Sequence, residues 1–131
     1  MATALPEALR NLVDEPVFAT LATIQPDGSP QVSVVWVKRD GDDVLFSTVE
    51  GRRKHLNVAR DPRVSVVLVS PSNPYTYFEV RGTVSLSHEG ARELIDELAR
   101  KYLGAERYEA DGPDDVRVVA RVTPRKVVSW G

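Results

Sequence analysis

The segment from Ser47 to Asn57 combines hydroxyl groups and cations where a strand is expected to end and a helix to begin. Backbone N–H groups at a helix N-terminus attract anions, and the side chains of Arg52, Arg53 and Lys54 would add charge-assisted hydrogen bonds. Cations in a first turn oppose the helix dipole at a cost of about 0.3–1 kcal/mol each, which a bound anion would offset. The segment therefore predicts an anion-binding cradle. A solvated basic helix face, with arginines paired to nearby carboxylates, explains the same residues equally well.

Two further groups could contact a flat ring. Ser33, Val35, Trp36 and Val37 on an expected strand could offer an apolar wall and backbone hydrogen bonds, although such residues more often pack a barrel. Tyr75 and Tyr77 belong to an aromatic cluster at a loop-to-strand junction, where a ring could stack. The sequence alone favours core or interface packing for these tyrosines.

Several kinds of site are excluded or disfavoured by residue types. The chain has no cysteine, so it has no disulfide, thiolate metal ligand or cysteine nucleophile. Its only histidines, His55 and His88, are expected to be surface residues. No pattern of serine, histidine and carboxylate indicates a catalytic triad, and the catalytic residues are not identifiable.

The composition is typical of one globular domain spanning residues 1–131, because 42% of the residues are hydrophobic and 27% are charged. A net charge of −2 disfavours a general binder of nucleic acids or anionic membranes. The sequence contains no apolar run of the roughly 20 residues that a membrane span needs, and its N-terminus lacks a leader pattern. We therefore expect a cytoplasmic protein.

The hydrophobic pattern predicts about seven strands and three short helices. Turn residues join most of the strands as antiparallel neighbours, which predicts an α+β fold built on a closed or split barrel. The expected helices cover residues 6–15, 51–60 and 87–104, and the expected strands cover residues 17–25, 31–38, 44–48, 63–70, 75–87, 116–122 and 127–130.

Five details of this prediction can be checked individually. The nearly continuous apolar run 63–70 indicates a central strand that is buried on both faces. Gly82 indicates a bulge, and Ser87 is expected to cap the third helix. Residues 71–74 are expected to form a loop, and Pro124 is expected to separate the two closing strands.

Several segments, taken in order, resemble the split-barrel flavoproteins related to pyridoxamine 5'-phosphate oxidase, and especially their branch that uses the deazaflavin coenzyme F420. The resemblance covers nearly the whole chain. The matching segments are residues 18–23, 27–30 with 35–37, 52–57, 61–64 and 80–84.

The resemblance implies a homodimer with cofactor sites at the subunit interface. In this family, the positions of Thr48, Arg52, Lys54 and Asn57 hold the cofactor's phosphate and tail. Val35, Trp36 and Val37 fall on the strand that lines the ring, and the partner chain closes the site near Tyr75 and Tyr77. The C-terminal Arg-x-His element of true pyridoxamine 5'-phosphate oxidases has no match in residues 124–131, which argues against oxidation of vitamin B6.

From this resemblance we expect a reductase that transfers hydride from reduced F420 to an electron-poor organic acceptor, such as an enone, a quinone or a tetrapyrrole. The cofactor carries the difficult chemistry, which agrees with the missing catalytic signature. The alternatives are an FMN-dependent oxidase or reductase of the same fold and a non-catalytic cofactor-binding protein.

Overall fold

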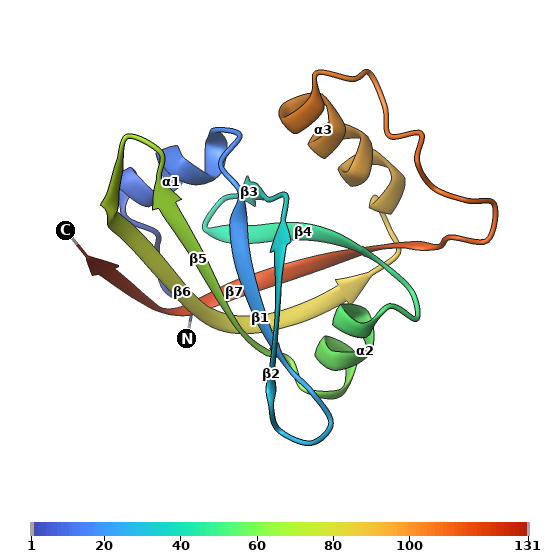
Figure 1. Cartoon of the computed structure of the whole chain (residues 1–131), viewed down its shortest axis with the longest axis horizontal. Coiled ribbons are helices and arrows are strands. Elements are labelled where there is room, and N and C mark those ends of the chain that lie inside the picture. Colours follow the sequence, from blue (N-terminus) through green and yellow to red (C-terminus); the bar gives the residue numbers. More distant parts are fainter. Residues whose placement is uncertain (1, 131) are drawn as a thin grey trace.

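The computed structural model describes residues 2–130 and shows an α+β fold with three helices around one seven-stranded sheet (Figure 1). The helices are α1 (Glu7–Asp14), α2 (Arg53–Arg60) and α3 (Ala91–Leu103). The strands are β1 (Ala19–Ile24), β2 (Pro30–Val35), β3 (Lys38–Asp40), β4 (Asp43–Val49), β5 (Arg63–Ser70), β6 (Asn73–Ser87) and β7 (Arg117–Trp130). The predicted α+β split barrel with three helices is confirmed. The number of strands also agrees, but β3 was not predicted as a separate strand and the two expected closing strands are one. None of the helices described is long and apolar enough to cross a membrane.

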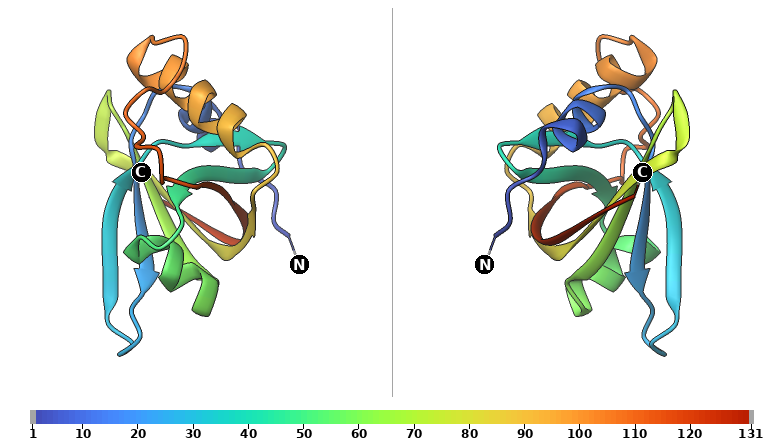
Figure 2. Two further views of the ribbon diagram at one scale, coloured as in Figure 1. Left: turned by 90° about the vertical axis from the view of Figure 1, so that its right-hand side faces the viewer. Right: turned by 90° about the vertical axis from the view of Figure 1, so that its left-hand side faces the viewer.

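The sheet curls into a barrel that stays split at one place. Its strand order is β2-β1-β5-β6-β7-β4-β3, and every neighbouring pair is antiparallel. The two edge strands, β2 and β3, are joined directly through Trp36 and Val37, so both edges of the sheet meet at these two residues. Figures 1 and 2 show α1 and α3 near one end of the barrel and α2 near the other.

Helix α3 closes the split. The Val37 N–H donates to the Tyr102 hydroxyl over 3.1 Å, and Lys101 Nζ donates to the Val37 carbonyl over 2.6 Å. The Tyr102 hydroxyl in turn donates to the Val17 carbonyl over 2.7 Å. These side chains satisfy backbone groups that a paired strand would otherwise satisfy, so the barrel closes without a seventh ladder.

Two apolar clusters hold the elements together. The barrel interior contains alternate residues of the strands, such as Leu21, Phe46 and Leu68, each at most 1% exposed. A second cluster lies between α3 and the outer face of β4 and β7, where Leu98 packs with Leu45 and other apolar residues. This second cluster fixes α3 over the strands that border the site described below.

Two strand predictions are wrong, one for the expected strand 31–38 and one for the two expected closing strands. The expected strand 31–38 ends at Val35, because the chain must cross from one sheet edge to the other. The two expected closing strands are one strand, β7, which passes through Pro124. Pro124 is paired with Gly82 where the β6 register shifts, so a bulge accommodates a residue without an N–H. The predicted bulge at Gly82 is confirmed: a Cβ there would lie 2.3 Å from the Thr123 carbonyl oxygen.

Three other details differ from prediction. Strand β5 is an interior strand as expected, but its burial alternates and Val69 is 40% exposed, so it is not buried on both faces. The expected loop 71–74 is a turn at residues 71–72, and β6 begins at Asn73. Ser87 does not cap α3: its Oγ accepts the Glu89 N–H in a turn before the helix, which begins after Gly90.

Candidate functional site

A groove of about 200 Å³ lies where the end of β2, strand β4, the start of α2, helix α3 and the start of β7 come together. One part of its lining is apolar and the other is cationic. The lining residues are Val34, Val35, Trp36, Ser47, Arg52, Lys54, Ile95, Leu98, Tyr108 and Arg117. A groove of this kind suits a ligand with a flat ring and an anionic end.

The cationic part comes from the start of α2 and from β7. Helix α2 has no acidic residue in its first turn and no side-chain cap at Arg52, so the predicted basic helix start is confirmed. Partial burial lowers the pKa of Lys54, and the like charges of Arg52 and Arg117 lower it further. No carboxylate in the described chain offsets this effect at Lys54. A bound anion would therefore stabilise the charged form of Lys54.

The apolar part is an aromatic wall. The Trp36 ring stacks on Tyr102, with 5.5 Å between centroids and 9° between planes, and Tyr108 meets Trp36 edge-on at 6.1 Å. Ile95 and Leu98 of α3 complete this side of the groove. Because α3 and the closing residues of the barrel fix Trp36, its ring offers a preformed surface to a planar ligand.

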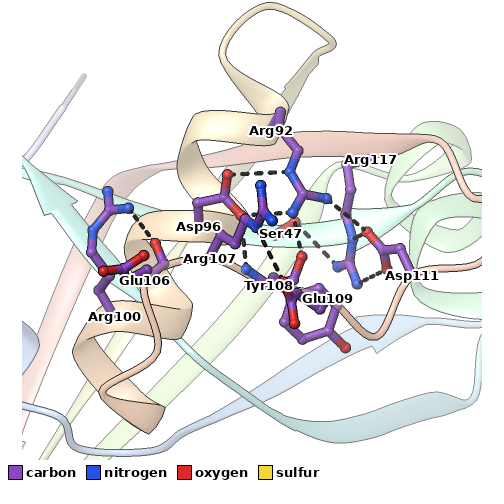
Figure 3. A network of polar contacts seen from close by, with 10 residues as sticks. All are labelled: Ser47, Arg92, Asp96, Arg100, Glu106, Arg107, Tyr108, Glu109, Asp111 and Arg117. Atoms are coloured by element: carbon purple, nitrogen blue, oxygen red, sulfur yellow. Dashed lines mark hydrogen bonds and ion pairs between the residues drawn. The ribbon is translucent and has the colours of Figure 1, made fainter.

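A polar network holds the long connection between α3 and β7 beside the groove (Figure 3). Arg117 forms a two-pronged ion pair with Asp111, over 2.6 and 2.9 Å, and its hydrogen bonds lower the pKa of Asp111. Asp96 accepts the Tyr108 N–H over 2.8 Å, and Arg92 donates to both Asp96 and the Tyr108 carbonyl. The network thereby fixes Tyr108 against Trp36.

Four residues predicted from the sequence come together in the groove: Val35, Trp36, Arg52 and Lys54. Sequence reasoning missed Ser47 as a lining residue, and it missed Tyr108 and Arg117 entirely. The only signal for the latter two was the unusual length of the polar connection in which Tyr108 lies, because long irregular segments in small domains often carry function.

The remaining predicted residues near this region do not line the groove. Asn57 is fully buried, and its Nδ2 donates to Thr23 Oγ1 over 3.0 Å, which ties α2 to β1. The hydroxyl oxygens of Ser33 and Thr48 are buried and have no hydrogen-bond partner in the described chain. Arg53 is exposed, and Val37 is fully buried in the barrel core.

The two predicted tyrosines lie on β6, outside the groove. Tyr75 is 78% exposed, and Tyr77 stacks on Trp130 with 6.5 Å between ring centroids. Their expected role, in which they would complete a site in a partner chain, stays a prediction.

Both histidines contact the turn that precedes α2. His55 Nδ1 accepts the Gly51 N–H over 3.0 Å, and His88 contacts the Glu50 carboxylate. His88 therefore lies in the connection before α3 and not in its first turn. Within residues 2–130, no group of three histidine, cysteine or acidic side chains is arranged to hold a metal ion.

A second hollow lies on the other side of the barrel, near Ala22, Pro30 and Thr83. It is larger, about 460 Å³, and mainly apolar. Two of its arginines, Arg63 and Arg81, form ion pairs with Asp61 and Glu79, and the third, Arg125, donates to Thr83 Oγ1. The groove beside α2 is the better candidate, because Lys54 has no carboxylate partner in the described chain and the groove joins this cation to an aromatic wall.

The residue types of the groove match a flavin or deazaflavin nucleotide, which joins a planar ring to a phosphate. At about 200 Å³, the groove holds part of such a ligand. The partly buried Lys54, without an offsetting carboxylate, matches the phosphate, and the fixed Trp36 ring matches the planar part.

Comparisons with known proteins identify the family of this chain. The family model described as pyridoxamine 5'-phosphate oxidase matches residues 5–131. A solved protein described as an F420 reductase is 31% identical, with a TM-score of 0.82, and the alignment covers 95% of this chain and 98% of that one. No curated protein matches the sequence.

Two more distant solved structures share the fold. A conserved hypothetical protein of Mycobacterium tuberculosis is 23% identical, with a TM-score of 0.79 and coverage of 98% of this chain and 86% of that one. A putative pyridoxamine 5'-phosphate oxidase of Listeria innocua is 18% identical, with a TM-score of 0.73 and coverage of 94% and 95%. The chain belongs to the pyridoxamine 5'-phosphate oxidase family and has its split-barrel fold.

Proposed function

We propose that the protein is an F420-dependent reductase that passes hydride to an electron-poor organic acceptor such as an enone, a quinone or a tetrapyrrole. The observation that carries this proposal is the groove itself, in which Arg52 and Lys54 face an aromatic wall formed by Trp36 and Tyr108. The similarity to a protein described as an F420 reductase supports the deazaflavin over a flavin.

When bound, the cofactor supplies the hydride chemistry, and the protein binds, orients and shields it. Lys54 and Arg52 hold its phosphate. Trp36 and Val35 support the ring, and Ile95 and Leu98 exclude water from the adjoining space. A nearby cation also stabilises negative charge that develops on an acceptor.

We further propose that two copies of the chain form a homodimer in which the outer sheet face of each is covered. That face exposes Val32 and Val34 on β2, Val69 on β5 and Trp130 on β7, each at least 40% exposed. Exposed apolar residues gathered on one sheet face are typical of an interface. Light scattering is expected to give the mass of a dimer, and Val34→Lys should shift the mass to that of a monomer. A monomeric wild-type protein would contradict this part of the proposal.

The test of the cofactor proposal is a fluorescence titration of the purified protein with F420 and, separately, with FMN. We expect tight binding of F420 and weaker binding of FMN. Lys54→Ala should weaken F420 binding by about 1.5–3 kcal/mol, the usual contribution of a hydrogen bond to a charged group. Arg52→Ala should have a smaller effect, because Arg52 is more exposed.

Arg53→Ala is the matched control, because Arg53 is the neighbouring cation but lies outside the groove. Equal losses of affinity in the Arg53 and Lys54 variants would mean that the overall positive charge of this region, and not a specific contact, attracts the ligand. That result would contradict the assigned site. Tighter binding of FMN than of F420 would favour the FMN-dependent alternative. Binding of F420 without turnover of enones, quinones or tetrapyrroles would favour a non-catalytic carrier.

A further inference from the structure

Arg117, the first residue of β7, is a partly buried cation that lines the groove. Its side chain is only 10% exposed, and that of its partner Asp111 is 13% exposed. The ion pair uses Nε and Nη2 of the guanidinium. The remaining nitrogen, Nη1, lies 3.3 Å from Ser47 Oγ, and both Arg117 and Ser47 line the groove.

The ion pair between Arg117 and Asp111 holds the α3–β7 connection against the barrel. This structural role does not by itself explain why a charged residue occupies this position. A buried ion pair contributes little net stability relative to apolar residues of similar size, because both charges lose their hydration. Here Arg117 also lies near two other cations, since its charge and that of Arg52 both act on Lys54. Asp111 pairs with Arg117, and Asp115 lies 3.9 Å from Arg52. Lys54 has no such carboxylate partner in the described chain, so a bound anion would offset its charge.

We propose that Arg117 Nη1 and the Ser47 hydroxyl bind the phosphate of the ligand together with Lys54 and Arg52. This inference rests on the proposed function, because it takes the ligand to be a ring joined to a phosphate. Ser47 accepts a hydrogen bond from Arg117 and keeps its own hydrogen to donate to a phosphate oxygen. The site therefore suits a phosphate ester better than an isolated carboxylate, because donors surround the anion from three elements.

The network in Figure 3 gives this role a matched control. Arg92 also approaches Asp111, with 3.8 Å between the charged atoms, but it does not line the groove. If Arg117 acts only by holding the connection in place, Arg92→Gln and Arg117→Gln should change ligand binding in the same way. If Arg117 binds phosphate, only Arg117→Gln should weaken binding in a manner that depends on the phosphate.

The experiment compares two ligands on each full-length variant by fluorescence titration. The first is F420 or FMN, whichever the wild-type protein binds more tightly, and the second is the corresponding ring–ribityl alcohol without the phosphate. Arg117→Gln should weaken binding of the phosphorylated ligand at least about 10-fold, and it should change binding of the alcohol by less than about 2-fold. Arg92→Gln should leave the ratio of the two affinities unchanged.

Ser47→Ala provides a second test of the phosphate contact if thermal melting shows that Arg117→Gln does not fold. It should weaken the phosphorylated ligand about 3- to 10-fold and leave the alcohol unaffected. Equal losses for both ligands in these variants would overturn the phosphate-binding role of Arg117 and Ser47 while the proposed function stands. If the wild-type protein binds neither F420 nor FMN, the proposed function and this inference both fail.

Discussion

Helices α2 and α3 border the same groove, but their charges follow opposite rules. Helix α3 has Glu93 in its first turn and Arg100 and Lys101 in its last, and a left-handed Gly104 ends it. This arrangement complements the helix dipole. Helix α2 has Arg53 and Lys54 in its first turn and no acidic residue there. The requirements of helix stability explain the ends of α3, whereas the proposed binding of an anion would explain the start of α2.

The largest expected effect tests whether α3 is the stabilising helix of the two. Leu98 is 1% exposed and packs in the cluster with Leu45 and Ile95. Leu98→Ala should lower the free energy of unfolding by about 2–5 kcal/mol, because it removes apolar contacts and leaves a cavity. Urea denaturation measures this change. Leu56→Ala on α2, where the side chain is 43% exposed, is the control and should change stability by less than about 0.5 kcal/mol.

A smaller effect tests the opposite charge patterns directly. Arg53→Glu replaces an exposed cation at the start of α2 with an acid, and it should raise the free energy of unfolding by about 0.3–1 kcal/mol. Glu93→Lys makes the reverse change in α3 and should lower it by a similar amount. Both shifts should shrink in 1 M salt. If Arg53→Glu destabilises the protein at low salt, the start of α2 is not electrostatically unfavourable and the comparison between the helices fails.

The smallest effect concerns the pH dependence of ligand binding. The pKa of Lys54 is lowered by burial and then by Arg52 and Arg117, so its ammonium loses its proton at a lower pH than an ordinary lysine. Because only the charged form attracts an anion, affinity for the phosphorylated ligand should fall as pH rises toward the usual lysine pKa of 10.5. Titrations between pH 7 and 10 measure this decline. Lys54→Arg should flatten it, and an equally steep decline in that variant would assign the titration to another group.

Much of the fold could be predicted because its turns and strands have local signals. Pro26 to Ser29 marks the β1–β2 turn, and Gly82 marks the place where the register between β6 and β7 shifts. The end of β2 had no such signal, because residues 31–38 form one run of strand-forming residues. Only the closing of the barrel forces the chain to leave β2 at Trp36, and this constraint involves the whole sheet.

The site was predictable to the extent that it is local. Arg52 and Lys54 are close in sequence and sit at a helix start, so their types and spacing indicate an anion site. Ser47 and Arg117 are 70 positions apart, and only the pairing of β4 with β7 brings them together. Asn57 shows the opposite case, since a polar residue close to the cradle in sequence instead holds α2 against β1.

A helix, and not strand pairing, closes this barrel. Exposure of the barrel backbone at the split and opening of the groove are therefore linked, whereas they are separate in a continuous barrel. The amide of Val37 is shielded by Tyr102, and the same helix supplies Ile95 and Leu98 to the groove. Release of α3 would therefore expose this amide to solvent deuterium and open the groove in one step. A ligand that binds to α3 would slow deuterium uptake at the Val37 amide. The exchange rate of this barrel-core residue would therefore report whether the groove is occupied.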